Sequence, residues 1–233
     1  ISHYLLEEKL GEGGMGKVFA ASDSLTRERV ALKVLNQGLL SDPENRKRLV
    51  AEGHLLSSID HPRIVKVYEV GEHLGQGFIA MEFLPGGTLE ALCRARAPLD
   101  TAESKRIALG ICDGLRETHR RGVIHRDLKS GNVMFDAGGG VRIMDFGLSK
   151  SPLVTTMTTL GTILGTLGYV SPEQVTNISV DQRADLFSFG VLLYEMLTGK
   201  LPFDGENEMA VIHAIFNTEP PPPSALNPAV PAR

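Results

Sequence analysis

Residues 125–132 read His125-Arg126-Asp127-Leu128-Lys129-Ser130-Gly131-Asn132, and residues 145–147 read Asp145-Phe146-Gly147. Each polar residue of these two strings, taken alone, suits a turn or an exposed surface position. Together they bring two aspartates, a lysine and an asparagine into two short segments that are close in sequence. Their order and spacing therefore indicate a functional site rather than two ordinary loops.

Glycines dominate an earlier segment, Gly11-Glu12-Gly13-Gly14-Met15-Gly16. This G-x-G-x-x-G pattern is weak evidence alone, because dinucleotide-binding turns also contain it. Such a turn should open a helix, whereas here residues 17–19 continue as a strand and the chain returns through residues 30–33. The glycines therefore cap a hairpin, in which backbone amides can approach a phosphate closely.

The strand-like string at residues 30–33 ends in Lys33, which would otherwise be an ordinary exposed residue. Glu52 changes this interpretation, because it lies on the apolar stripe of a helix predicted over residues 42–60. An unpaired carboxylate there would have a large desolvation cost, which an ion pair with Lys33 removes. Gly53 lowers the stability of this helix by about 1 kcal/mol relative to alanine, so we hypothesise that the helix is mobile.

Strand and helix signals are segregated along the chain. Strand-like patterns fall at residues 4–35, 64–70 and 78–83, with one helix between Asp42 and Pro62. After a break at Pro85-Gly86-Gly87, helix patterns fall at 88–95, 100–121, 186–198 and 208–216, and short strand-like pieces at 123–124, 133–135 and 141–143. Segregated strands and helices favour an α+β chain with a β-rich first lobe and a mainly helical second lobe.

The composition is that of a globular protein without a strong electrostatic preference. A formal net charge of −4 over 233 residues gives no general attraction to nucleic acid or to an anionic membrane, although Arg116, Arg120 and Arg121 could form a local basic patch. No signal peptide is visible, and the most apolar stretch, residues 186–197, is far shorter than the about 20 residues of a membrane span. We therefore expect no nucleic-acid partner, no membrane segment within this chain and a reducing cytoplasm. Cys93 and Cys112 are expected to be reduced core residues.

These motifs together, in this order and at this spacing, resemble the signature set of the protein kinase superfamily. The resemblance covers essentially the whole chain and implies one catalytic domain over residues 1–233. It implies a two-lobed α+β fold with an N-lobe at 1–81 containing one main helix, a hinge at 82–87 and a mainly helical C-lobe at 88–233. The chain ends at Arg233, before the terminal helices usual in the family, so the C-lobe is expected to lack them.

The resemblance also implies a role for each motif residue. Asp127 would orient the substrate hydroxyl and accept its proton, and Lys129 would stabilise the transferring phosphoryl group. Lys33, held by Glu52, would contact the ATP phosphates. Thr166 would bond near Asp127 as part of the surface that receives the substrate.

Two oxygen-bearing residues, Asn132 and Asp145, are the implied ligands of Mg²⁺, with Mn²⁺ as an alternative. His125 and Phe146 are implied to be architectural. The implied ATP-binding residues come from the glycine-rich hairpin, the strands beside it, the hinge and one short strand of the second lobe. They are Leu10, Gly11, Glu12, Gly13, Gly14, Met15, Gly16, Val18, Ala31, Lys33, Met81, Glu82, Leu84 and Met134.

Asp185 comes directly before the apolar run at 186–197. On pattern alone, a helix N-cap and a buried functional residue are equally good interpretations. The family resemblance favours a buried carboxylate that accepts hydrogen bonds from backbone amides of the 125–132 loop.

The expected substrate class follows from Lys129 and from the string Tyr169-Val170-Ser171-Pro172-Glu173 after Gly165-Thr166, which resemble serine/threonine rather than tyrosine kinases. The glycine-rich sequence at 13–16 and the prolines at 220–223 resemble those of bacterial kinases of the eukaryotic-like type. The expected function is transfer of the γ-phosphate of ATP to serine and threonine hydroxyls of protein substrates. The expected location is the cytoplasm, with the cytoplasmic domain of a longer membrane-anchored protein as an alternative.

Threonines crowd the segment before Glu173, at positions 155, 156, 158, 159, 162 and 166, and no acidic residue lies between Lys150 and Glu173. Arg126 therefore finds no permanent anion there, whereas each phosphate would add about −1.5 to −2 charges. We predict autophosphorylation between Thr155 and Thr162, with the phosphate ordering the segment against Arg126. A polar segment that is never phosphorylated is the alternative.

Two other classes of function are alternatives. A pseudokinase or scaffold would hold nucleotide without transferring phosphate. Such proteins typically lose a lysine or an acid from the catalytic set, and here the lysines, the glutamate, the aspartates and the asparagine are all present. A small-molecule phosphotransferase would share the chemistry but should lack the segment at 166–173 that presents a peptide.

Overall fold

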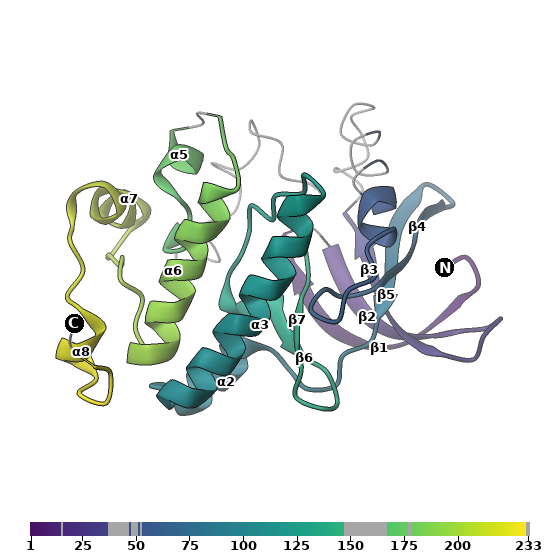
Figure 1. The fold of residues 1–233 in the computed structure, drawn as a ribbon. Helices are drawn as coiled ribbons and strands as arrows, with labels where there is room; N and C mark the ends of the chain where they lie inside the picture. Colours follow the sequence, from purple (N-terminus) through teal and green to yellow (C-terminus); the bar gives the residue numbers. More distant parts are fainter. Residues whose placement is uncertain are drawn as a thin grey trace. The chain divides into compact units, whose positions relative to one another are not determined.

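The computed structural model of the chain describes residues 1–14, 16–36, 47, 51, 53–146, 167–176 and 179–231. These residues form two compact units. The first contains the described residues from Ile1 to Pro85 and the second those from Gly86 onward. The first unit is built around a sheet, and the second is built mainly of helices (Figure 1).

The first unit contains a five-stranded antiparallel sheet with the order β1-β2-β3-β5-β4. Its strands are β1 (Tyr4–Gly13), β2 (Gly16–Asp23), β3 (Arg29–Leu35), β4 (Val67–His73) and β5 (Gln76–Glu82). The hairpins predicted over residues 4–35 are confirmed. The two later strands are shifted from the predicted 64–70 and 78–83, because polar residues such as Glu72 and Gln76 pair in the hairpin although they lack the apolar pattern.

One face of this sheet forms a hydrophobic core from Tyr4, Ala21, Val30, Leu32, Phe78 and Ala80. Side chains alternate between the two faces along a strand. Ala31 and Lys33 each follow a core residue in β3, so they belong to the opposite face.

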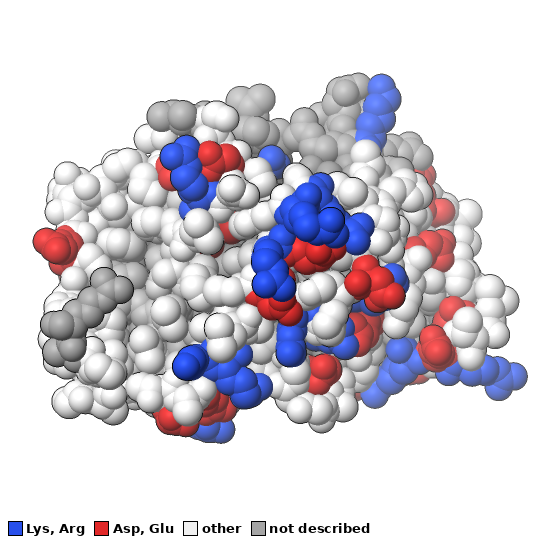
Figure 2. Space-filling model, in the orientation of Figure 1, with Lys and Arg blue, Asp and Glu red and all other residues white. Residues whose placement is uncertain are grey.

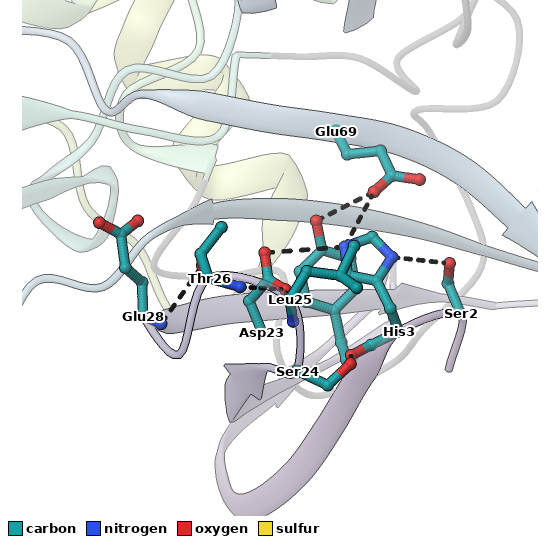
Figure 3. Close-up of polar contacts among 9 residues, drawn as sticks. Ser2, His3, Asp23, Ser24, Leu25, Thr26, Glu28 and Glu69 are labelled. Atoms are coloured by element: carbon teal, nitrogen blue, oxygen red, sulfur yellow. Dashed lines mark hydrogen bonds and ion pairs between the residues drawn. The ribbon is translucent and has the colours of Figure 1, made fainter.

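The start of β1 is held by a polar cluster around His3 (Figure 3). His3 Nε2 lies 3.7 Å from Asp23 Oδ2 and 3.9 Å from Glu69 Oε2. The Tyr4 hydroxyl donates to Glu69 Oε2 at 2.9 Å, and the Ser24 hydroxyl donates to the His3 carbonyl at 2.7 Å. Burial, followed by the neighbouring Glu69 carboxylate, raises the pKa of Tyr4, so this hydroxyl remains a donor. The cluster joins the N-terminal segment to β2 and β4.

Residues 53–57 are helical and pack on the sheet through Gly53. A Cβ atom at Gly53 would lie 2.6 Å from Val70 Cγ2 and 3.1 Å from two further Val70 carbons, closer than van der Waals contact allows. The close approach of this helix to β4 therefore explains the glycine. The mobility of the helix stays a hypothesis, and Glu52 lies outside the described residues.

Replacing Gly53 by alanine is expected to destabilise the protein, although alanine favours a helix by about 1 kcal/mol. The new methyl group would overlap Val70, a β-branched residue with few alternative rotamers, and such overpacking costs about 1–3 kcal/mol. The midpoint of urea unfolding should therefore fall.

Gly190→Ala is the matched control for this substitution, because a Cβ atom at Gly190 would meet nothing within 4 Å. That variant should raise the urea midpoint, as helix propensity alone requires. If Gly53→Ala also raised the urea midpoint, the predicted overlap of the new methyl group with Val70 would be wrong.

The second unit is mainly helical. Its helices are α2 (Leu89–Arg96), α3 (Thr101–Arg120), α5 (Pro172–Val175), α6 (Arg183–Thr198), α7 (Glu208–Asn217) and α8 (Pro223–Leu226). A 3-10 turn, η2 (Ser130–Asn132), leads into a hairpin of β6 (Val133–Phe135) and β7 (Val141–Ile143). The helices predicted at 88–95, 100–121, 186–198 and 208–216 and the strands predicted at 133–135 and 141–143 are confirmed, with small shifts at their ends. Within the described part of the chain, no helix has both the length and the apolar character that crossing a membrane requires.

Helix α3 organises the second unit. It begins after Asp100, whose side chain accepts a hydrogen bond from the Ala102 amide at 2.8 Å. Its buried side includes Ile107, Ile111 and Leu115. Helix α6 and the β6–β7 hairpin both pack on α3 (Figure 1). The 125–132 loop, which connects α3 to β6, is therefore held within the unit.

Two sequence predictions for this unit are wrong. Residues 123–124 do not form a strand, because the backbone that follows them is bonded to a side chain of α6 and not to a neighbouring strand. Cys112 is exposed, whereas Cys93 is buried as expected. The buried side of α3 includes Ile111, and the next residue is turned about 100° away from it around the helix.

Charges of both signs are mixed on the face shown in Figure 2, where blue and red side chains lie next to one another. The arginines near the end of α3 are paired. Glu117 accepts hydrogen bonds from Arg120 at 2.9 Å and from Arg121 at 2.6 Å, and these bonds lower the pKa of Glu117 to about 2. Arg116 is bonded to Asp113. The local basic patch that the sequence suggested is therefore largely neutralised by its own helix.

Candidate active site

The 125–132 loop is held by one buried carboxylate. Asp185, only 1% exposed, lies in the first turn of α6. Its Oδ2 accepts a hydrogen bond from the His125 amide at 2.8 Å, and its Oδ1 accepts one from the Arg126 amide at 2.9 Å. These bonds fix the loop where Arg126 has a left-handed backbone, with a φ of 63°. The buried interpretation of Asp185 is therefore correct and the N-cap interpretation is wrong, because α6 has already begun at Arg183.

A further hydrogen bond to Asp185 comes from His119, which the sequence interpretation does not include. His119 Nε2 lies 2.7 Å from Asp185 Oδ2. Burial by itself raises the pKa of Asp185, but the bond from His119 and the bonds from the two backbone amides oppose this rise, and the pKa lies below its ordinary value. The aspartate therefore stays ionised in a buried position. One feature of the sequence could have indicated this role: His119 comes one helical turn after the buried Leu115, in line with the apolar side of α3.

His125 is fully buried, and both of its ring nitrogens are bonded. Nδ1 accepts from the Asp127 amide at 3.2 Å, and Nε2 is 3.0 Å from the Met144 carbonyl oxygen. An amide can only donate and a carbonyl can only accept, so the ring is the neutral Nε2–H tautomer. Burial lowers the pKa of His125, which agrees with a neutral ring. The ring also lies against Phe146, with the ring centroids 4.6 Å apart, so both residues support the loop as expected.

Asp127, the predicted proton acceptor, is close to two of the residues grouped with it. Lys129 Nζ is 3.5 Å from Asp127 Oδ2. The Asn132 side-chain amide donates to the Asp127 carbonyl at 2.7 Å and to Asp127 Oδ2 at 3.0 Å. The Asn132 backbone amide donates to the Lys129 carbonyl at 3.0 Å, which closes η2. One ammonium and one amide thus orient the Asp127 carboxylate, which is 11% exposed.

Asn132 and Asp145 lie at the same end of the β6–β7 hairpin. The Met144 amide donates to the Asn132 carbonyl at 3.0 Å, which extends the ladder by one step, and Asp145 follows with a left-handed φ of 56°. Asn132 uses its side-chain nitrogen for Asp127. Its side-chain oxygen and the Asp145 carboxylate are hard oxygen donors of the kind that Mg²⁺ prefers.

A metal ion at this end of the hairpin would have few protein ligands. Among the described residues, no group of three or more His, Cys, Asp or Glu side chains is arranged to hold a metal ion. Mg²⁺ typically binds through one or two carboxylates and completes its shell with water and phosphate oxygens. Asn132 and Asp145 therefore fit a metal that arrives with a phosphate better than a permanent structural metal.

Four of the predicted nucleotide-binding residues of the first unit share the face of its sheet opposite the hydrophobic core, namely Val18, Ala31, Lys33 and Met81. Val18 pairs with Lys33, and Met81 pairs with Ala31. Directly paired residues lie on the same face, and Ala31 and Lys33 are two residues apart in β3. Lys33 is only 7% exposed. The ammonium of Lys33 places a positive charge among small and apolar side chains on this face, which would attract an anion to it.

The glycine-rich segment connects β1 to β2 as a hairpin, which confirms the prediction and excludes a dinucleotide-binding turn followed by a helix. Gly16 has a φ of 150°, and a Cβ atom there would lie 2.0 Å from the Val34 carbonyl oxygen, so only glycine lets β2 approach β3 at this point. At Gly11, Gly13 and Gly14 a Cβ atom would meet nothing within 4 Å. The space that a side chain would take up at these three glycines is therefore empty.

The remaining predicted residues are distributed over both units. Leu10 and Glu12 are exposed on the glycine-rich hairpin, Glu82 ends β5, and Leu84 after it is buried. Met134 lies in β6 of the second unit and is half-buried. Several predicted residues lie outside the described part of the chain, namely Met15, Glu52, Gly147, Thr166 and the threonines at 155–162.

Comparison with known proteins gives these motifs a family context. A family model described as "Protein kinase domain" matches residues 4–226. A probable serine/threonine-protein kinase of Corynebacterium efficiens is 37% identical over 227 residues, which cover 95% of this chain and 34% of the relative. The probable serine/threonine-protein kinase PknB of Bifidobacterium longum is 36% identical over 239 residues, with 98% and 35% covered. The serine/threonine-protein kinase PrkC of Bacillus subtilis is 34% identical over 228 residues, with 98% and 35% covered. The chain thus spans about a third of the length of these curated relatives.

Proposed function

Because this chain belongs to the protein kinase family, we propose that it transfers the γ-phosphate of ATP to serine and threonine hydroxyls of protein substrates. The observation that carries the proposal is the Asp127 carboxylate, oriented by Lys129 and Asn132 in a loop fixed from α6. The relatives named above are serine/threonine-protein kinases, which supports the choice of hydroxyl. A unit built around an antiparallel sheet and a mainly helical unit together give the α+β composition of the two-lobed kinase fold.

In the proposed reaction, the oxygen of a substrate hydroxyl forms a bond to the γ-phosphorus while the bond from that phosphorus to the β–γ bridging oxygen breaks. ADP leaves with the electron pair, and the hydroxyl proton passes to the Asp127 carboxylate. Lys129, 3.5 Å from Asp127 Oδ2, would offset negative charge on the transferring group. Asn132 holds the carboxylate by donating to Oδ2, so the proton acceptor is oriented before substrate arrives.

We assign nucleotide binding in the first unit to the glycine-rich hairpin and to the face of the sheet that carries Lys33. Backbone amides of residues 11–14 would donate to phosphate oxygens, and no side chain at Gly11, Gly13 or Gly14 obstructs the approach of the phosphates. Lys33 would supply a cation to the phosphates, with Glu52 as its partner. Val18 and Ala31, on the same face as Lys33, offer an apolar surface for the base.

We assign the metal to Asn132 and Asp145, as Mg²⁺ with Mn²⁺ as an alternative. When bound, the ion would neutralise charge on the phosphates of ATP. The chain's own contribution is to present an amide oxygen and a carboxylate at one end of the β6–β7 hairpin. Removal of divalent cations with EDTA should therefore stop phosphate transfer.

The proposal is tested by incubating the chain with γ-labelled ATP, Mg²⁺ and a generic protein substrate. The expected result is label in phosphoserine and phosphothreonine, and no labelling after EDTA. A pseudokinase would instead show ATP binding, seen as a higher thermal unfolding temperature, without labelled protein. A small-molecule phosphotransferase would consume ATP only when a small hydroxyl acceptor is present. Either outcome would overturn the proposal.

The chain itself is a second expected product. Mass spectrometry after incubation with ATP and Mg²⁺ should find phosphate between Thr155 and Thr162, a segment with hydroxyls and no carboxylate. Arg126 supports this, because its Nε is buried without a hydrogen-bond partner among the described residues, and an anion would satisfy it. Asp127→Asn chain treated in the same way is the control and should remain unmodified. An unphosphorylated segment in the active wild-type chain would contradict the prediction.

We also propose a cytoplasmic location, alone or as the cytoplasmic domain of a longer membrane-anchored protein. The proposed reaction needs ATP, which the cytoplasm supplies. The cysteines at 93 and 112 are both free, which suits a reducing compartment.

A further inference from the structure

Three side chains of the second unit, one of them from the 125–132 loop, form a closed ring of polar contacts in which both hydroxyls donate to one carboxylate. Ser130 Oγ lies 3.0 Å from the Tyr169 hydroxyl oxygen and 3.2 Å from Glu195 Oε1. The Tyr169 hydroxyl donates to Glu195 Oε2 at 2.5 Å. Ser130 is 3% exposed and Tyr169 is 7% exposed. The ring therefore joins η2, the segment before α5 and helix α6 in the interior of one unit.

The hydroxyl groups of the ring satisfy a carboxyl group that is removed from water. Both oxygens of Glu195 are bonded to hydroxyls, one to Ser130 and one to Tyr169. Burial raises the pKa of Glu195, and these two bonds oppose the rise. Burial and the Glu195 charge also raise the pKa of Tyr169, so the phenol keeps its proton. Because a buried polar group without partners is costly, loss of one hydroxyl would disturb the whole ring.

Ser130 begins the turn that carries two residues of the candidate active site. Lys129 directly precedes η2 and Asn132 ends it, and the side chains of both contact Asp127. The backbone bond that closes the turn joins Lys129 to Asn132, so it does not fix the turn relative to the rest of the unit. The buried Ser130 side chain does so, because it is bonded to Glu195 of α6.

The Tyr169 side of the ring is anchored as well. The Ser188 hydroxyl of α6 donates to the Tyr169 carbonyl at 2.7 Å. The Gln174 side-chain amide donates to the Arg126 carbonyl at 2.8 Å. The segment 167–176 is thus bonded both to α6 and to the 125–132 loop, which makes the ring a fixed point for η2.

We propose that Ser130 is a positioning residue that holds η2, and with it Lys129 and Asn132, for phosphoryl transfer. Its hydroxyl acts through the ring with Tyr169 and Glu195 and not on the reacting atoms. This inference rests on the proposed kinase function and adds to it a residue that needs no contact with nucleotide or substrate.

The test measures kcat and the KM for ATP in Ser130→Ala, Ser130→Thr and Tyr169→Phe. Ser130→Ala removes the hydroxyl and should lower kcat about tenfold, with the KM for ATP changed less than about twofold. Ser130→Thr keeps the hydroxyl and should retain most of the wild-type kcat. The kcat of the double variant Ser130→Ala/Tyr169→Phe should be no lower than that of the less active single variant, because the effects of groups that act as one unit are not additive.

Tyr194→Phe and Ser104→Ala are the matched controls. Tyr194 is the neighbour of Glu195 on α6, and its hydroxyl donates to the Pro221 carbonyl at 3.0 Å. Ser104 is buried on α3, and its hydroxyl has no hydrogen-bond partner among the described residues. Each control removes the same atom as one test variant and should keep the kcat of the wild-type chain.

Wild-type kcat in Ser130→Ala, or equal losses in Ser130→Ala and Ser130→Thr, would overturn the inference. Urea unfolding of Ser130→Ala, Tyr169→Phe and the double variant separates this outcome from failure of the proposed function. If the wild-type chain transfers no phosphate, the proposed function fails. In that case non-additive losses of stability would still support the ring as the anchor of η2, and additive losses would overturn it.

Discussion

Replacing Asp127 by asparagine is expected to lower kcat for phosphate transfer by about 10³-fold, within the range typical for loss of a general base. Asparagine has the shape of aspartate and can still accept the hydrogen bond from Asn132 through its side-chain oxygen. It cannot take up the substrate proton, and it offers no negative charge to the Lys129 ammonium 3.5 Å away. The KM for ATP should therefore change little, while kcat falls by the amount stated. Steady-state kinetics with labelled ATP measure both constants.

Asp136 provides the matched control for this substitution in the same unit. Its Oδ1 accepts hydrogen bonds from the Gly138 and Gly140 amides at 3.0 and 2.7 Å, in the turn between β6 and β7. Asp136→Asn keeps an oxygen acceptor in the turn and should retain the kcat of the wild-type chain. Wild-type kcat in Asp127→Asn would defeat the assignment of the proton acceptor. Equal losses in both variants would indicate damage to the unit and not a loss of chemistry.

Most of the fold follows from patterns between residues that are close in sequence. The apolar repeat of α3 and the strand-forming residues of β2 and β3 are local signals, and the structure confirms these elements. The ends of elements are less predictable, because Gln76 extends β5 by pairing with a residue that the local pattern does not include. Residues 123–124 have strand-forming side chains but no partner strand, and the backbone that follows is bonded to Asp185 instead.

Gly53 is a second case in which a local property of the sequence does not predict a contact with a distant strand. Its intrinsic helix propensity suggests a weak helix, whereas the structure places it where a side chain would overlap Val70. Propensity is a property of the residue, but a close contact depends on a strand that is distant in sequence.

The candidate site is predictable where its members share one motif. Asp127, Lys129 and Asn132 lie within one loop, and the structure brings their side chains together. His119 and Glu195 lie outside this motif, because each contacts the loop from a separate helix. Long-range hydrogen bonds of this kind depend on packing between elements, which no local pattern specifies.

Asp185→Asn is expected to destabilise the protein by about 3 kcal/mol, as typically follows when a buried charged network loses a partner. Asp185 Oδ1 accepts from the Arg126 amide, and Oδ2 accepts from the His125 amide and from His119. Asparagine has only one acceptor oxygen, so its NH₂ group must face a backbone N–H, and one buried donor loses its partner. The loop would shift around Asp127, and a displacement of about 1 Å near the reacting atoms can lower kcat by about 10²-fold. Urea unfolding and steady-state kinetics measure the two effects.

Asp100→Asn is the control that isolates the cause, because Asp100 accepts one amide, from Ala102 at 2.8 Å, and asparagine caps a helix equally well. Its stability should match that of the wild-type chain. The pH dependence gives a second check. Because the folded-state pKa of Asp185 is lowered, its contribution to stability is fully present above the unfolded pKa of about 3.9 and is lost as the pH falls through the lower folded value. The difference in unfolding free energy between wild type and Asp185→Asn should therefore narrow below about pH 4. A difference that stays constant with acidification would mean that the asparagine acts by its shape and not through the missing carboxylate.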